Sequence, residues 1–141
     1  MTYSRDGVTF DFPTDWRVEA EDNNEAGWAV SFHNPADTAF VLISLHPDAD
    51  DPARLADETL AAMREVYTEL DADNRVETIA GQAAIGYDLD ILTVDVTVVC
   101  RIRSLQTPLG PLLIIVQTAE PEYATTDPVL RAVVASLVIE E

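Results

Sequence analysis

Two long runs of alternating apolar and polar residues follow one another in the second half of the chain. The apolar residues occupy odd positions from 85 to 91 and even positions from 94 to 103. This two-residue period is that of a β-strand with one face in the core. The apolar residues of neighbouring strands must face the same side of the sheet. Here they are at odd positions in one run and at even positions in the other, so the residue numbers of two cross-strand partners add up to an odd number, for example Leu89 with Val98. A turn of two or four residues near 92–95 satisfies this condition, so the runs predict an antiparallel hairpin.

Helix signals precede and follow this hairpin. Asp51 is a good N-cap residue, and Pro52 suits the first position of a helix. Apolar residues then recur at helical spacing as far as Leu70, where we expect the first helix to end. Asp127 and Pro128 repeat the same start and predict a second amphipathic helix that reaches residue 137.

Further strands are predicted where short apolar runs end at turn residues. They lie at residues 8–12, 16–20, 28–33, 39–46, 75–79 and 112–118. The order of strands, helix, strands and helix predicts one α+β domain over residues 1–141. We expect a central antiparallel sheet of about six to seven strands flanked by two main helices, an α/β/α sandwich.

The chain is strongly acidic, with 26 acidic residues, 8 basic residues and a formal net charge of −18. All the basic residues are arginine. Such a charge repels nucleic-acid backbones and anionic membranes, so we expect neither as a partner. The acids are spread along the chain, which favours adaptation of the whole surface to a high-salt cytoplasm, as in a halophile, over an acidic face that docks a basic partner. A GC-rich genome would also deplete lysine, and the composition does not separate these causes.

The sequence indicates a soluble, cytoplasmic protein, unless the chain is the trimmed form of an exported precursor. The first ten residues contain one arginine and no apolar run, unlike a secretory signal. No apolar stretch reaches the roughly 20 residues that span a bilayer. The single cysteine, Cys100, occupies an apolar position of the second alternating run, so we expect a buried thiol rather than a reactive one.

Few side chains could carry chemistry. His33 and His46 would lie at opposite ends of a hairpin, more than roughly 20 Å apart, too far to share a metal ion or a substrate. Asp88 and Asp90 share a strand face near Arg101, which favours exposed charge pairing over acid–base catalysis. No Gly-rich phosphate loop, G-x-S-x-G or H-E-x-x-H motif is present. We therefore predict no catalytic residue, no metal ligand and no cofactor.

The candidate binding residues are Trp16, Asp48, Asp50 and Asp51. The three acids resemble the start of a calcium loop, but the glycine and the glutamate that an EF-hand requires are missing. Capping of the following helix explains them better than a metal ion. Trp16 follows a proline turn, where it could anchor a partner, although core packing is the more frequent role.

Three short motifs resemble those of PsbP-like domains. Residues 10–18 match an F-x-x-P-x-x-W-x-V opening, residues 107–110 resemble the last hairpin of the family, and residues 136–139 are similar to its final SL-x-I signature. The resemblance implies a central antiparallel sheet with helices on both faces. Members of the family include the extrinsic PsbP subunit of photosystem II, a nuclear factor that binds the GTPase Ran, and chaperones of type VI secretion effectors. These members bind another macromolecule and catalyse no reaction.

We therefore expect a non-enzymatic binding or accessory domain, chaperone-like or adaptor-like, that holds a protein partner on an exposed sheet face or edge. The alternative is a domain that binds a small molecule or a divalent cation, through the acids at 48–51 or a pocket beside Trp16. An uncovered face or a free edge could also pair with its own copy, and the expected product is a symmetric homodimer.

Overall fold

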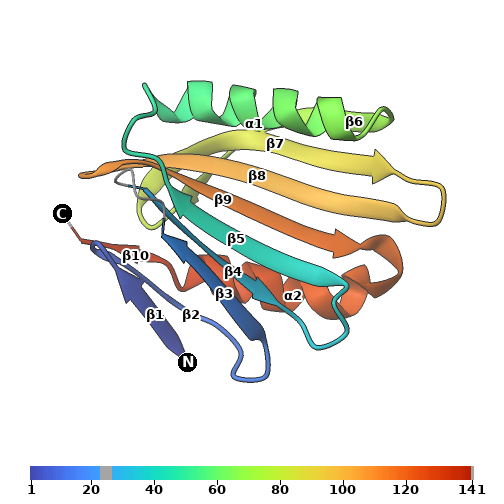
Figure 1. Ribbon diagram of the computed structural model, residues 1–141, viewed down its shortest axis with the longest axis horizontal. Helices are drawn as coiled ribbons and strands as arrows, with labels where there is room; N and C mark the ends of the chain where they lie inside the picture. Colours follow the sequence, from blue (N-terminus) through green and yellow to red (C-terminus); the bar gives the residue numbers. More distant parts are fainter. Residues whose placement is uncertain (23–26, 141) are drawn as a thin grey trace.

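The computed structural model describes residues 1–22 and 27–140. Its main element is a seven-stranded antiparallel sheet in the order β3-β4-β5-β9-β8-β7-β6 (Figure 1). The strands are β3 (Arg17–Asp22), β4 (Trp28–His33), β5 (Ala39–Leu45), β6 (Leu70–Ile79), β7 (Gln82–Leu92), β8 (Thr97–Thr107) and β9 (Gly110–Ala119). The apolar strand β9 is the central one, as the sequence predicts.

A second, three-stranded sheet joins the two ends of the chain. It consists of β1 (Thr2–Arg5), β2 (Val8–Asp11) and β10 (Val138–Ile139), with β2 in the middle. Val138 pairs with Thr9 and Ile139 with Val8, so the N- and C-terminal segments lie side by side (Figure 1). The sequence predicts β2 but neither of its neighbours.

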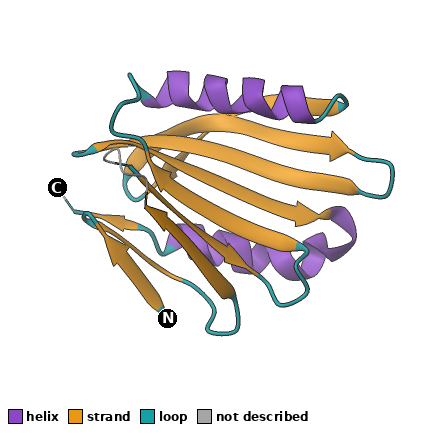
Figure 2. Ribbon diagram, viewed as in Figure 1, coloured by secondary structure: helices purple, strands orange, loops and turns teal. Residues whose placement is uncertain are grey.

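The helices cover opposite faces of the large sheet (Figure 2). α1 (Pro52–Val66) packs against β7, β8 and β9. α2 (Tyr123–Ala135) follows a 3₁₀ turn at Glu120–Glu122 and packs against β9, β5 and β2, so the small sheet lies on the α2 side. The predicted α+β fold is confirmed. Neither of these two helices, in the part of the chain that the structure describes, has the length and apolar content needed to cross a bilayer.

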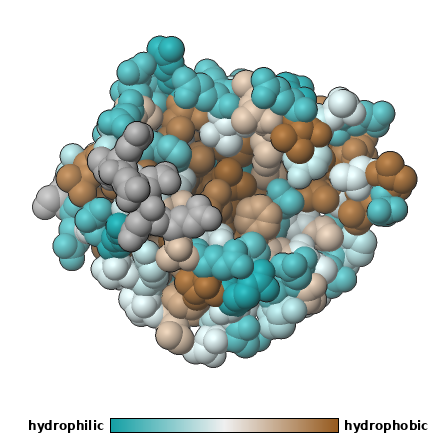
Figure 3. Space-filling view, in the orientation of Figure 1, coloured by the Kyte–Doolittle hydropathy of each residue, from teal (hydrophilic) through white to brown (hydrophobic). Residues whose placement is uncertain are grey.

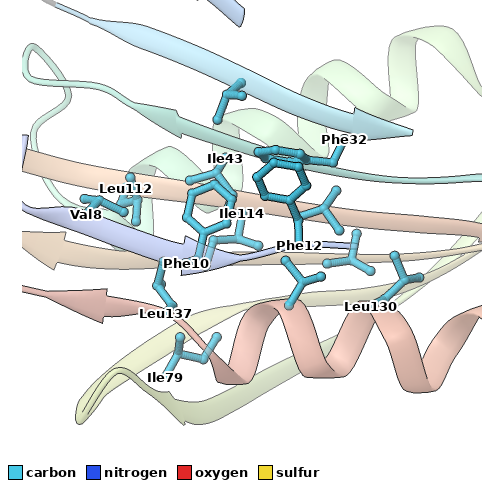
Figure 4. Packing of buried hydrophobic residues seen from close by; sticks show 14 of the residues in the cluster. Val8, Phe10, Phe12, Phe32, Ile43, Ile79, Leu112, Ile114, Leu130 and Leu137 are labelled. Atoms are coloured by element: carbon cyan, nitrogen blue, oxygen red, sulfur yellow. The ribbon is translucent and has the colours of Figure 1, made fainter. Parts of the chain in front are cut away.

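The larger core lies between the sheet and the layer formed by α2 and the small sheet (Figure 4). At its centre Phe32 contacts Phe10 and Phe12, with ring centroids 5.1 and 4.4 Å apart. Ile114 of β9 and Leu130 of α2 are buried in the same cluster. Because aromatic side chains bury the most apolar area each, this group contributes most to holding the two sheets together.

The smaller core lies beneath α1, where Leu55 packs on the inner residues of β7, β8 and β9. Leu89, Ile91 and Cys100 are buried there. The prediction of a buried cysteine is confirmed, and burial raises the pKa of the Cys100 thiol to about 12.

The β7–β8 hairpin has the predicted parity but a different register. Leu89 pairs with Cys100, not with Val98, and their residue numbers add up to an odd number as expected. The pairing ends at Leu92 and Thr97, which leaves a turn of four residues. Val94, predicted to face the core, is in this turn and is fully exposed. The Thr93 hydroxyl holds the turn through hydrogen bonds with the backbone of Val96.

α1 begins as predicted and ends earlier. Asp51 is the N-cap, and its Oδ1 accepts a hydrogen bond from the backbone N–H of Arg54 at 2.8 Å. The helix ends at Val66 rather than near Leu70, since Tyr67 is already extended. Leu70 starts β6 and pairs with Ile91, so a long-range strand partner replaces the last helical turn.

α2 begins earlier than predicted and also ends earlier. Its first residue is Tyr123, and Pro128 lies inside the helix rather than at its start. The Asp127 side chain accepts hydrogen bonds from two arginines instead of capping the helix. The helix ends at Ala135, because residues 138 and 139 form β10.

Candidate functional site

The α1 face of the sheet is only partly covered by a helix. α1 lies over β7, β8 and β9, and no helix of the described residues packs on this face of β3, β4 and β5. We call the side chains of β3, β4 and β5 that point to this side the open face. They are Arg17, Glu19, Ala29, Ser31, His33, Phe40, Leu42 and Ser44. Figure 3 shows apolar side chains gathered in a hollow near the middle of the molecule.

Phe40 and Leu42 are the apolar centre of the open face. Both are partly exposed and pack against the smaller core. Leu42 pairs across the strands with Ser31 and Ile115, and the Phe40 ring lies 5.8 Å from that of His33. A sheet normally buries such side chains beneath a second layer, whereas here both remain partly exposed.

A cavity of about 550 Å³ adjoins this apolar centre at the N-terminal end of α1. Its apolar wall includes Leu42, Leu55 and Leu113. Its polar lining includes Asp48 and Glu58, and neither lysine nor arginine is among the lining residues. The cavity therefore combines an apolar wall with a negatively charged rim.

His46 also lines this cavity and does not supply a positive charge. Its Nε2 lies 2.8 Å from the Ser44 Oγ, within hydrogen-bonding distance. Burial lowers the pKa of His46 below its ordinary value of 6.5, so the imidazole is neutral at neutral pH. Among the lining side chains the charge therefore comes from the two carboxylates, and Arg54, 3.3 Å from Glu58, offsets part of it.

The second histidine, His33, lies at the other end of the β4–β5 hairpin, as predicted. It has a similar contact with a serine. His33 Nε2 lies 3.0 Å from the Ser31 Oγ. A Ser–His contact is the core of a nucleophilic site, but the third group is too distant, because Asp37 Oδ1 is 3.7 Å from His33 Nδ1. β4 is paired on both sides, so its backbone N–H groups donate to neighbouring strands rather than to an oxyanion. As it stands, the arrangement lacks the hydrogen bond that would orient the imidazole as a base.

The structure separates the candidate binding residues. Trp16 is buried in the larger core, with 9% of its surface exposed. Asp51 caps α1, and Asp50 Oδ2 lies 3.0 Å from Arg54 Nη1 in an exposed ion pair. Only Asp48 lines the cavity. Within residues 1–22 and 27–140, no three or more His, Cys, Asp or Glu side chains are grouped to hold a metal ion.

The sequence interpretation did not single out Phe40 and Leu42 as functional residues. A signal for them exists, since residues 39–45 are apolar at almost every position rather than alternately. Such a run indicates a strand with apolar side chains on both faces. It does not indicate that one of these faces is left partly uncovered.

The predicted PsbP-like fold is confirmed by comparison with solved structures. No family model and no curated protein matches the sequence. The solution structure of cyanobacterial PsbP (CyanoP) from Synechocystis is similar, with a TM-score of 0.66 and 17% identity, over 99% of this chain and 92% of that one.

Two other structures share the fold. PA94 from Pseudomonas aeruginosa, a protein of unknown function, has a TM-score of 0.61 and 16% identity, over 100% of this chain and 97% of that one. LpqN of Mycobacterium tuberculosis, a protein involved in cell envelope biogenesis, has a TM-score of 0.54 and 12% identity, over 95% of this chain and 83% of that one. At these identities the likeness establishes the fold and leaves function to the site.

Proposed function

We propose that this domain is a non-enzymatic accessory module that holds a protein partner on its open face. The partner segment would be apolar and flanked by lysine or arginine. The observation that carries the proposal is the partial exposure of Phe40 and Leu42 beside a cavity of about 550 Å³ with an acidic rim.

The shape and composition of the open face support an extended or helical peptide as the occupant. The apolar strip continues from Phe40 and Leu42 to Leu113 in the cavity wall. Covering such a strip removes apolar area from water, which contributes roughly 25 cal/mol for each Å². Helices and strands that dock in this way supply apolar side chains at regular spacing.

The charges support basic flanks. The chain carries a net charge of −18, and the cavity lining contains Asp48 and Glu58 but no lysine or arginine, although Arg54 outside the lining pairs with Glu58 at 3.3 Å. A basic flank would be attracted over a distance and would then lie against these carboxylates. An acidic flank would be repelled by the same groups.

Two synthetic peptides with the same leucine–alanine body, one ending in lysine pairs and one in glutamate pairs, test the proposal by fluorescence anisotropy. We expect the lysine-ended peptide to bind at least tenfold more tightly. Leu42→Glu should weaken it at least tenfold, whereas Val76→Glu, at a strand position that is 71% exposed at the other edge of the sheet, should not. Equal binding of the two peptides, or equal effects of the two variants, would show that the open face is not the site.

A photo-crosslinker at position 42, introduced in the native host, extends the test to the natural partner. We expect the captured segment to be apolar with adjacent lysine or arginine. Crosslinks to a second copy of this chain would contradict the proposal and assign the open face to a homodimer.

A further inference from the structure

A second cavity, of about 300 Å³, lies on the opposite face of the sheet between α2 and the strands β6, β8 and β9. Three arginines line it: Arg101 and Arg103 from β8, and Arg131 from α2. The whole chain has only eight basic residues against 26 acidic ones. More than a third of its positive charge is therefore gathered around one small cavity, which we call the arginine cavity.

Most of the donors of Arg103 are used by the protein itself. Its Nε donates to Glu77 and its Nη2 to Asp88, each at 2.7 Å. Its Nη1 donates to the backbone carbonyls of Tyr87 and Ile102. The role of Arg103 is to fix the strands around the cavity, and it has few donors left for a ligand.

Arg101 and Arg131 share a single carboxylate. Arg101 Nη1 donates to Asp127 Oδ1, and Arg131 Nε donates to Asp127 Oδ2, both at 2.6 Å. Asp127 is buried, and burial alone would raise its pKa, but the two arginines hold the pKa below its ordinary value of 3.8, so the carboxylate is ionised at neutral pH. The group of two guanidinium ions and one carboxylate carries a net charge of +1 at the wall of the cavity.

The Arg101 guanidinium has unused donors in a sheltered position. Its side chain is only 12% exposed, and its Nε and Nη2 have no hydrogen-bond partner among the described residues. A guanidinium presents five N–H groups in a planar fork, which matches the two oxygens of a carboxylate. These unused donors give the cavity the polar half of an anion site.

The rest of the lining is mixed: Glu77, whose carboxylate accepts a hydrogen bond from Arg103, and Thr78 are polar, and the other side chains are apolar. Ile114 and Val116 come from β9, and Val134 comes from α2. A bare inorganic anion would leave this wall uncovered, whereas an organic anion would cover it. A volume of about 300 Å³ is at the lower end of the range for small-molecule pockets, so the occupant is short.

We propose that the arginine cavity binds a small organic carboxylate. The carboxylate accepts hydrogen bonds from Arg101 and Arg131, and the short apolar body lies against Ile114, Val116 and Val134. The net charge of the protein opposes the approach of anions, so binding depends on these directed donors rather than on the overall field. This inference does not depend on the proposed function, because the arginine cavity and the open face lie on opposite faces of the sheet.

Three probes are compared. Hexanoate has a carboxylate and an alkyl chain, acetate has the carboxylate without the chain, and hexanol has the chain without a carboxylate. Titrations of the ¹⁵N-labelled protein are followed by NMR, including the arginine Nε–H signals. We expect hexanoate to shift the signals of Arg101 and Val134 with a Kd of about 1 mM, and the other two probes to bind at least tenfold more weakly. Comparable binding of hexanoate and hexanol would overturn the proposal, as would the lack of saturable shifts at about 20 mM hexanoate.

Two variants and a matched control locate the site. Arg131→Gln removes an exposed arginine and should weaken hexanoate binding several-fold, whereas Arg64→Gln makes the same charge change on α1 and should leave it unchanged. Ala135→Phe keeps every charge and should abolish binding by filling the cavity mouth. Equal effects of the two arginine substitutions, or tight binding to Ala135→Phe, would contradict the assignment.

Discussion

Gly86, in the middle of β7, is where we expect the smallest substitution to be most costly. A Cβ at this position would lie 1.8 Å from the carbonyl oxygen of Ile102 and 2.7 Å from its carbon. A carbon atom approaches a carbonyl oxygen to about 3.3 Å at best. The obstacle is backbone of the neighbouring strand β8, which cannot rotate away as a side chain could.

Gly86→Ala would therefore force β7 and β8 apart by about 1.5 Å. Such a shift breaks about two hydrogen bonds of the ladder, at about 1 kcal/mol each, and adds about 1–3 kcal/mol of overpacking. Alanine also restricts the unfolded chain, which stabilises the folded protein by less than about 1 kcal/mol. We expect the free energy of unfolding to fall by about 3–4 kcal/mol.

Urea unfolding measures this change directly. With an m-value of about 2 kcal/mol per molar urea, the midpoint should fall by roughly 1.5–2 M at unchanged m. Gly81→Ala is the matched control in the turn of the β6–β7 hairpin, where a Cβ meets nothing within 4 Å but φ is +77°. It should cost only about 1–2 kcal/mol of backbone strain. A cost for Gly86→Ala that is no larger than that for Gly81→Ala would refute the reasoning.

Three further predictions concern charge and burial. Asp127→Asn should lower the unfolding free energy at neutral pH by about 3 kcal/mol, because Arg101 loses its buried carboxylate. Since its arginines lower the pKa of Asp127, this contribution to stability is present above the ordinary pKa of 3.8 and is lost as the pH falls below 3.8. Urea titrations at several pH values measure the difference in unfolding free energy between variant and wild type. A difference that stays constant down to about pH 3 would contradict this. Cys100, with a pKa of about 12, should not react with Ellman's reagent at about pH 8 until urea unfolds the protein, and rapid labelling of the folded protein would show that the thiol is accessible. Raising KCl from about 0.1 to 2 M should raise the Tm, because screening weakens the self-repulsion of a net charge of −18, and a lower Tm in high salt would count against adaptation of the whole surface.

The sequence predicts β2, the strands of the large sheet and their parity, because these depend on local periodicity. It does not predict where a helix or strand ends when that end is set by pairing with a strand far away in the sequence. Tyr67 and Leu70 continue the apolar face of α1, yet Leu70 joins β6 through its pairing with Ile91. Val138 likewise leaves the helical pattern to pair with Thr9. Neither partner is visible in a local window, so long-range pairing overrides helix propensity at both places.

The candidate sites were predictable to a smaller extent. The capping role of Asp51 follows from local chemistry and is confirmed. Periodicity does not show which faces of the sheet the helices cover. For this reason the alternation in β8 predicts that Arg101 and Arg103 point to solvent. α2 lies over them, and Arg103 is only 5% exposed. The same ambiguity concealed Leu42, whose face α1 leaves partly open.

The pairing of β2 with both β1 and β10 has a consequence for synthesis on the ribosome. Phe10 and Phe12 are made early, but α2 and β10, which complete their surroundings, come last. At about 5–20 residues per second, the intervening chain takes roughly 10 s to emerge. During that time the aromatic group lacks its cover and is open to chaperones and to aggregation. The segment that carries α2 and β10 therefore closes the larger core, and this domain should complete its folding only after that segment has left the ribosome.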